Sequence, residues 1–325
     1  MNILITGGAG YIGSHCLKAL KGHNLVVVDD LSRGYAEVVP ASIPLYIETI
    51  AHIEAIRKIL RKHAIEAVIH CAAYAYVHES IQDPLLYYNN NISAGLALLE
   101  AMKAEGVKKL VFSSSCSVYG VPSTLPITEA MPIQPISPYG FTKVAFESIL
   151  KEAVRAYGLR AIALRYFNAA GADPDGKVGD RNLSSPHIIP RALEVALGKA
   201  PHLCIFGYEY PTPDGTCIRD YIHVSDLAKA HALALNKLES LNYGIYNLGS
   251  GQPHSIIELI SEVERITAKA IPYSIEAAKA GDPPALYADY SLAQKELGWE
   301  PVYSDLTTIL KTAWAWRLSL SKRKQ

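Results

Sequence analysis

Residues 2–30 read NILITGGAGYIGSHCLKALKGHNLVVVDD, and this stretch decides the fold. The pattern predicts four consecutive parts: a buried strand at 2–6, a glycine-rich turn at 7–13, an amphipathic helix to about residue 21 and a second apolar strand at 24–28,. A strand, a helix and a second strand within about thirty residues form the repeating unit of doubly wound sheets. The stretch therefore predicts an α/β protein with a doubly wound parallel sheet.

The glycine turn also predicts a binding site for a dinucleotide. Gly7 permits the tight turn, Gly10 lets the main chain approach a diphosphate, and Gly13 allows the following helix to pack closely,. The start of that helix offers unpaired N–H groups and the positive end of its dipole. Asp29 ends the second strand, where a carboxylate binds both hydroxyls of a ribose and repels a 2′-phosphate. The stretch therefore predicts NAD rather than NADP as the cofactor.

Helices and strands continue to alternate beyond this first unit. Further strands are predicted at 45–47, 67–70, 109–112 and 161–165, with helices at 53–63, 84–105 and 138–157 between them. Such alternation predicts one parallel sheet with helices on both faces, the Rossmann type of fold. Asn89, Asn90 and Asn91 interrupt the helix at 84–105. Either they reach toward the loops that bind the cofactor, or they form a solvated face.

Residues 137–143, SPYGFTK, form the candidate chemical centre. Ser137 can cap a helix on which Tyr139 and Lys143, four residues apart, share one face. An ammonium beside a phenol favours the phenolate, so the pair is a candidate for acid–base catalysis. The chain holds 20 tyrosines, however, and about one Tyr-x-x-x-Lys is expected by chance,. The serines at 113–115 follow a predicted strand and therefore lie at the same sheet edge as the glycine turn.

Composition disfavours several other classes of protein. Hydrophobic residues make up 50% of the 325 residues and charged ones 19%, as in a folded globule,. Lys+Arg and Asp+Glu are equal at 31 each, and no apolar run reaches membrane-spanning length, so we expect neither nucleic acid nor membrane as a partner,. The five cysteines and eleven histidines show no metal-binding spacing, so we expect reduced thiols in the cytoplasm and no metal site,.

The residue composition of the sequence changes after Asn168. A long loop rich in glycine, proline, asparagine and aspartate follows, then a helix predicted at 191–197 and an apolar run at 203–207. After a polar loop come a helix predicted around 224–237, a strand at 244–248 and two or three later helices. We therefore predict two domains. Residues 1–168 form the NAD-binding Rossmann domain, to which segments near 220–250 return, and residues 169–325 form a smaller, interleaved mixed α/β lobe that binds the substrate.

Seven motifs spread over nearly the whole chain carry a resemblance to a known family. They are GGAGYIGSH (7–15), HCAAYAYVHES (70–80), SSSCSVYG (113–120), SPYGFTK (137–143), LRYFN (164–168), GYEYPTPDGTCIRDYIHVSDLA (207–228) and YNLGSGQPHSIIEL (246–259). The chain resembles the extended short-chain dehydrogenase/reductase family and, within it, the UDP-glucose 4-epimerases. The first and fourth motifs are shared by the whole superfamily, whereas the fifth and sixth are more specific to sugar-nucleotide 4-epimerases.

The resemblance implies roles for individual residues. Ser115 corresponds to the hydroxyl that shares a proton with the sugar O4, Tyr139 to the base, and Lys143 to the residue that lowers the pKa of that tyrosine and binds the nicotinamide ribose. The positions that contact NAD are Gly7, Gly10, Tyr11, Ile12, Gly13, Asp29, Asn90, Ser113, Tyr139, Lys143 and Tyr166. The positions that hold the UDP-sugar are Asn168, His187, Phe206 (beside the uracil), Arg219, Lys279, Asp282 and Leu286.

The resemblance also implies a reaction and an assembly. The reaction is NAD-dependent 4-epimerisation of a UDP-hexose, between UDP-glucose and UDP-galactose, as used in galactose metabolism. A 4-keto intermediate forms, rotates about its diphosphate link and is reduced on its opposite face. Each turnover regenerates the cofactor, which should therefore stay bound. The expected assembly is a homodimer joined through the helices at 84–105 and 138–157.

Departures from the family pattern leave some points open. Glu48 stands where relatives have Gly-Asp beside the adenine, and Lys279 stands where an arginine commonly helps to bind the diphosphate,. Leu286 occupies the gate on substrate size, where a tyrosine excludes N-acetylated sugars and a smaller residue admits them. UDP-N-acetylglucosamine therefore remains an alternative substrate, and so does UDP-arabinose, because AYAYV at 73–77 resembles its 4-epimerases.

Other functions remain as less favoured alternatives. A nucleotide-sugar dehydratase carries an acidic pair after its serine or threonine, whereas Cys116 and Ser117 follow Ser115 here, and a UDP-glucuronate decarboxylase is a further alternative. A non-catalytic NAD sensor commonly lacks the tyrosine or the lysine, and both are present. The alternative for Arg219 is a structural ion pair with a carboxylate. Finally, Phe141 is expected to face away from the sugar.

Overall fold

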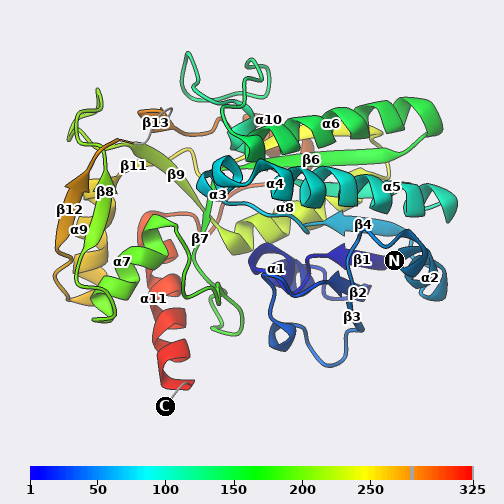
Figure 1. Ribbon diagram of the computed structural model, residues 1–325, viewed down its shortest axis with the longest axis horizontal. Coiled ribbons are helices and arrows are strands. Elements are labelled where there is room, and N and C mark those ends of the chain that lie inside the picture. Colours follow the sequence, from blue (N-terminus) through cyan, green and yellow to red (C-terminus); the bar gives the residue numbers. More distant parts are fainter. Residues whose placement is uncertain (279–281, 324–325) are drawn as a thin grey trace.

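A seven-stranded parallel sheet dominates the computed structural model, which describes residues 1–278 and 282–323 (Figure 1). Its strands are β1 (Asn2–Thr6), β2 (Asn24–Asp29), β3 (Leu45–Ile47), β4 (Ala67–His70), β5 (Lys109–Ser115), β6 (Arg160–Tyr166) and β10 (Tyr243–Leu248). Their order is β10-β6-β5-β4-β1-β2-β3, and every neighbouring pair is parallel. The order runs outward on both sides of β1 and β4, so the predicted doubly wound sheet is confirmed.

Helices cover both faces of this sheet. One face carries α1 (Tyr11–Ala19), α8 (Val224–Lys237) and α10 (Ser291–Leu297), and the other carries α2 (Ile53–Lys62), α5 (Ala94–Ala104) and α6 (Pro138–Tyr157). Along β1, Ile3 and Ile5 pack toward the first group and Leu4 toward the second. Successive strand residues point to opposite faces, and both faces are buried, so these strands are continuous apolar runs.

A smaller lobe lies to the left in Figure 1 and has its own core. Its strands are β7 (Asn168–Ala170), β8 (Leu203–Phe206), β9 (Ile218–His223), β11 (Pro253–Ser255), β12 (Tyr273–Glu276) and β13 (Ala285–Leu286), and its helices are α7 (Ile188–Ala196), α9 (Ile256–Thr267) and α11 (Leu306–Arg323). β9 pairs with β7, β11 and β13, while β8 pairs with β12. The chain passes back to the large sheet through α8 and β10, and the division into two domains at residue 168 stays a prediction.

The helix predicted at 84–105 contains a π-helical turn. It consists of α4 (Pro84–Tyr88), η2 (Asn89–Ser93) and α5, with η2 in the π conformation. Within η2 the buried Asn91 accepts a hydrogen bond from the main-chain N–H of Tyr74 at 2.9 Å and donates one to its carbonyl at 3.0 Å. Asn89 is exposed. Of the two alternatives for the asparagines, the reach toward the loop after β4 therefore holds for Asn91, and such turns often mark functional sites.

Several short elements were not predicted from the sequence. Most belong to the smaller lobe: β7, β9, β11, β12 and β13, together with the helix α3 (Val77–Gln82) and the 3₁₀ turns η1 (Ala36–Val38) and η3 (Cys116–Val118). β9 reads IRDYIH, where charged residues hide the alternation that predicts a strand,. No helix within residues 1–278 and 282–323 is both long and apolar enough to cross a lipid bilayer.

Candidate active site

The glycine turn leaves the start of α1 open toward a cavity. Gly7 has a φ of +69°, and a Cβ at Gly13 would lie 2.2 Å from the carbonyl oxygen of Gly7, so side chains at either position would disrupt the turn,. Gly10 is the residue before α1, and in the described chain no side chain caps this helix. The N–H groups of the first helical turn are therefore available to an anion such as a diphosphate.

Asp29 lies at the end of β2 with a fixed carboxylate. Its two oxygens accept hydrogen bonds from the main-chain N–H groups of Ala9 and Leu31, both at 2.9 Å. The residue is only 7% exposed, and burial raises the pKa of its carboxyl group. Each oxygen keeps a further lone pair, so this carboxylate fits the pair of ribose hydroxyls that the sequence analysis assigned to it.

A cavity of about 1290 Å³ lies at the carboxyl ends of the parallel strands and extends into the smaller lobe. It is large enough for a dinucleotide together with a sugar nucleotide, because ligand pockets for one small molecule are commonly about 300–1,000 Å³. Every site residue predicted from the sequence lines this cavity, with two exceptions. Ser113 lies behind its wall, and Lys279 falls outside the described residues. Phe141 does not line it, and its side chain is half exposed.

The candidate catalytic residues converge on the start of α6. Ser137 caps this helix, as predicted, by accepting a hydrogen bond from the N–H of Gly140 at 3.1 Å. Tyr139 and Lys143 are 6% and 3% exposed and line the cavity from the same face. The Lys143 ammonium donates to the carbonyl oxygen of Ser113 at 2.8 Å and lies 5.6 Å from the centre of the Tyr139 ring. This anchors the lysine at the end of β5.

Burial changes the acidity of both groups. It raises the pKa of Tyr139 to about 12, and a hydrogen bond with Ser115 acts in the opposite direction. Burial also lowers the pKa of Lys143 to about 8, opposed by the nearby groups of Cys71 and Glu147. The fall in the tyrosine pKa that the sequence analysis expected is therefore not produced by these protein groups alone. Such a fall would require a further positive charge in the cavity.

A buried ion pair supports this arrangement, and the sequence analysis assigned it no role. Arg165 on β6 donates two hydrogen bonds to Glu147 on α6, at 2.9 and 2.6 Å, and both side chains are almost fully buried. The Ser114 hydroxyl donates to the same carboxylate at 2.6 Å, and Arg165 also donates to the Tyr119 hydroxyl at 2.8 Å. The sequence did contain a signal for this ion pair. An arginine in an apolar strand and a glutamate one turn after Lys143 each require a partner when they are buried.

Side chains from scattered segments form the other end of the cavity. Arg219 on β9 donates to Asp282 at 2.6 Å and to the carbonyl oxygen of Ile218 at 2.8 Å. The ion pair considered as an alternative for Arg219 is therefore present, but its partner is itself a predicted substrate-binding residue. Leu286 pairs with Arg219 in the register of β13 and β9. The Asn168 side chain donates to the Asp220 carbonyl at 2.9 Å.

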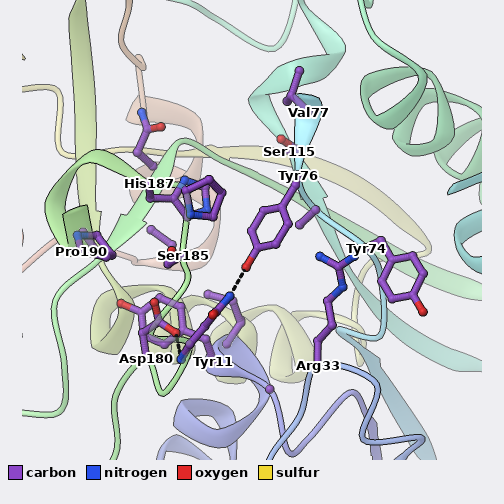
Figure 2. A pocket seen from close by; sticks show the side chains of 18 of the residues that line it. Tyr11, Arg33, Tyr74, Tyr76, Val77, Ser115, Asp180, Ser185, His187 and Pro190 are labelled. Carbon is purple, nitrogen blue, oxygen red and sulfur yellow. Dashed lines mark hydrogen bonds between the residues drawn. The ribbon is translucent and has the colours of Figure 1, made fainter. Parts of the chain in front are cut away.

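A tyrosine that the sequence analysis assigned no role bridges the two ends. Figure 2 shows Tyr76 reaching across the cavity from the loop after β4. Its hydroxyl accepts a hydrogen bond from the Asn182 amide at 2.6 Å, and its ring lies edge-on to His187 with 5.7 Å between centres. The Arg33 guanidinium lies 4.8 Å from this ring and 4.3 Å from that of Tyr74. In the sequence, the signal for Tyr76 was the pair of tyrosines, Tyr74 and Tyr76, within the motif at 70–80.

Comparisons with known proteins agree along nearly the whole chain. The sequence profile of the NAD dependent epimerase/dehydratase family matches residues 3–249. A UDP-glucose 4-epimerase of Azospirillum brasilense is 44% identical over 323 residues, which cover 98% of this chain and 93% of that protein.

Solved structures give the same result. The crystal structure of UDP-glucose 4-epimerase from Brucella ovis in complex with NAD is 47% identical, with a TM-score of 0.93 over 96% of this chain and 97% of that one. UDP-glucose-4-epimerase from Stenotrophomonas maltophila, with bound NAD and formylated UDP-arabinopyranose, is 40% identical, with a TM-score of 0.96 over 99% of each chain.

Proposed function

The chain belongs to the NAD-dependent epimerase/dehydratase family, and from this premise we propose that it interconverts UDP-glucose and UDP-galactose by epimerisation at C4 through a transient 4-keto sugar. One observation carries the proposal: Ser115, Tyr139 and Lys143 line the same cavity as the glycine turn and Arg219. The enzyme is thus an isomerase that uses NAD without consuming it.

The residues at the cofactor end fit NAD. The uncapped start of α1 suits its diphosphate, and Asp29 suits its adenosine ribose,. When bound, oxidised NAD supplies a hydride acceptor for C4 of the sugar and a positive charge near Tyr139. The Glu48 carboxylate also lines the cavity and accepts a hydrogen bond from the N–H of Thr49 at 2.9 Å.

Three residues of the chain carry the proton. We assign to Tyr139 the removal of the proton from the sugar O4, and to Ser115 the hydrogen bond that links this oxygen to the phenol,. Lys143 is anchored on the carbonyl of Ser113 with its ammonium 5.6 Å from the centre of the phenol ring, and its charge would favour the phenolate together with the positive charge of bound NAD,. The same groups return the proton to O4 after the keto sugar has rotated and is reduced on its opposite face. Each cycle therefore restores the starting protonation state of the site.

The other end of the cavity suits a UDP group. Arg219 can donate a pair of parallel hydrogen bonds to a diphosphate, and Asp282 orients it by accepting one of its N–H groups,. Asn168 and His187 line the same region, and Phe206 is assigned to the uracil. The role of Lys279 remains a prediction from the sequence.

The identity of the sugar depends on the gate at Leu286, which is half-buried and lies beside Arg219. A leucine is smaller than the tyrosine that excludes N-acetylated sugars, so UDP-N-acetylglucosamine stays a second candidate. UDP-arabinose is a third, since the related structure from Stenotrophomonas maltophila holds a formylated UDP-arabinopyranose.

We also propose that the protein forms a homodimer through α4, α5 and α6. Apolar side chains are exposed on these helices, among them Leu85 (69%), Leu96 (46%) and Phe141 (50%). Phe141 packs edge-on against Tyr88 with 6.0 Å between ring centres, which joins α4 and α6 into one surface. Exposed apolar surface of this kind commonly marks an interface. Sedimentation of the purified protein at twice its monomer mass is the expected result.

The cytoplasmic location stays a prediction. All five cysteines are free thiols.

The test of the function is direct. We expect the purified protein to retain NAD and to interconvert UDP-galactose and UDP-glucose without added cofactor. UDP-N-acetylgalactosamine and UDP-arabinose, assayed in parallel, define the substrate range. If none of the three is converted, the proposed function is wrong.

Tyr139→Phe should reduce turnover by about 10²–10⁴-fold, because it removes the acid–base group. Tyr157→Phe, the same change at the opposite end of α6, is the control and should leave turnover unchanged. Full activity of Tyr139→Phe would exclude this residue as the base.

A further inference from the structure

Three side chains that can bind a metal ion meet beside the cofactor end of the cavity, and none has a role in the proposed reaction. They are Cys16 on α1, Cys71 directly after β4 and His231 on α8. Their donor atoms lie within 4.8 Å of one another. Among the residues that the structure describes, these three form the one group of histidines, cysteines and acidic residues whose donor atoms lie close enough together to hold a metal ion. Its members are far apart in the sequence, so spacing gave no signal.

The histidine is oriented as a ligand. Its Nδ1 lies 2.8 Å from the carbonyl oxygen of Leu227, which can only accept a hydrogen bond,. Nδ1 therefore carries the proton, and the Nε2 lone pair accepts a hydrogen bond from the Ser113 hydroxyl at 2.8 Å, within 4.8 Å of both sulfur atoms. Metal-binding histidines are fixed in this way, by donating their second ring N–H to a carbonyl or a carboxylate.

A fourth donor lies among the three. The Ser113 hydroxyl is 2.8 Å from His231 Nε2 and 3.3 Å from Cys71 Sγ. Bonds of about 2.3 Å to sulfur and about 2.0 Å to nitrogen place the ligand atoms of a tetrahedral zinc ion roughly 3.5–3.8 Å apart. The observed spread of 4.8 Å therefore requires each donor to move by less than about 1 Å,.

The chemistry of these donors selects the ion. Thiolate and imidazole ligands favour Zn²⁺ and other thiophilic cations over Mg²⁺ or Ca²⁺, which prefer oxygen. A divalent ion would displace the two thiol protons and form two metal–sulfur bonds, so the filled site gains no net charge. That balance matters because Cys16 and His231 are fully buried, where an uncompensated charge is costly,.

We propose that Cys16, Cys71 and His231 form a binding site for a thiophilic divalent cation, Zn²⁺ in the first instance, and that filling it inhibits the enzyme. Cys71 lines the cavity whereas Cys16 and His231 lie behind it, so the ion enters past Cys71 from the cavity. Inhibition follows from Ser113, whose hydroxyl contacts two of the ligands and whose carbonyl holds the Lys143 ammonium. A shift of Ser113 toward the ion moves that anchor.

Metal binding is measured on the reduced full-length protein as purified. Titration with Co²⁺ should give the charge-transfer band of cobalt–thiolate bonds, and Zn²⁺ should abolish this band at one equivalent per chain. Cys16→Ala and His231→Gln should each weaken binding by about tenfold or more. Cys204→Ala, which removes a thiol from β8 in the other lobe, is the matched control and should bind as the unchanged protein does. The absence of a thiolate band, or an unchanged affinity in Cys16→Ala, overturns the proposal.

Two further measurements separate this site from simple packing of buried thiols. Cys71→Ser nearly preserves side-chain volume, so its loss of the cobalt band reports ligation even where Cys16→Ala folds poorly. Zn²⁺ should inhibit turnover reversibly, with recovery on chelation, and should not do so in Cys16→Ala. Because the cobalt measurement needs no enzymatic activity, its failure is distinguishable from failure of the proposed epimerase reaction.

Discussion

At its cofactor end the cavity is shaped by main chain, whereas at its sugar-nucleotide end it is shaped by side chains. The first end depends on a turn within residues 7–13, whose N–H groups face the cavity, and on a carboxylate fixed by two main-chain hydrogen bonds. The second end depends on residues from five separate segments, such as Arg219 and Asp282, which hold one another in place. A main-chain site tolerates change at few positions, while a side-chain site can be altered one contact at a time.

The largest effect is expected at the glycine turn, where the main chain itself is proposed to bind the cofactor. A Cβ in Gly13→Ala would lie 2.2 Å from the Gly7 carbonyl oxygen, so the turn and α1 cannot both keep their positions. We expect this variant to lose bound NAD and, with it, all activity. Gly10→Ala is the comparison, because its Cβ would lie 3.2 Å from the same oxygen. It should fold normally but retain less NAD. The comparison fails if Gly13→Ala purifies with a full complement of cofactor.

The next effect tests the buried ion pair between Arg165 on β6 and Glu147 on α6. Glu147→Gln leaves Arg165 charged and buried without its counterion, so the free energy of unfolding should fall by about 3–5 kcal/mol,. Glu152→Gln is the matched control on the same helix. Its partner Arg155 and Glu152 itself are both well exposed, so the change should cost about 0.5 kcal/mol or less,. Denaturant unfolding measures both free energies. Equal losses in the two variants would show that the buried pair stabilises the fold no more than the exposed pair does.

The same contrast explains how much the sequence predicted. The glycine turn, the strands of the large sheet and the pair Tyr139/Lys143 depend on residues close together in the chain, and their spacing indicated them. The contacts of Tyr76 with Asn182 and of Arg165 with Glu147 join residues that only the tertiary fold brings together. Short strands such as β9 were missed because they are defined by their partners rather than by their own apolar pattern,.

A smaller and more selective effect is expected at the sugar-nucleotide end. Arg219→Lys keeps the positive charge but loses the paired donors, so the KM for the UDP-sugar should rise by about 10- to 100-fold, equivalent to about 1.5–3 kcal/mol. The content of bound NAD should stay unchanged, because Arg219 lies in the smaller lobe. Steady-state kinetics and quantification of released NAD measure the two properties on one preparation. A loss of NAD in this variant would show that the two ends of the cavity are not independent.

The smallest effect concerns Tyr76, which belongs to both ends. Tyr76→Phe keeps the ring that packs against His187 and Arg33 but removes the oxygen that accepts the Asn182 amide. One such hydrogen bond contributes about 1 kcal/mol, so the KM for the UDP-sugar should rise about fivefold. Asn182→Ala should have a similar effect, and the double variant should be little worse than either single one, because both remove the same contact. Additive effects would show that the two side chains act separately. A fall in bound NAD larger than the change in KM would instead assign Tyr76 to the cofactor end.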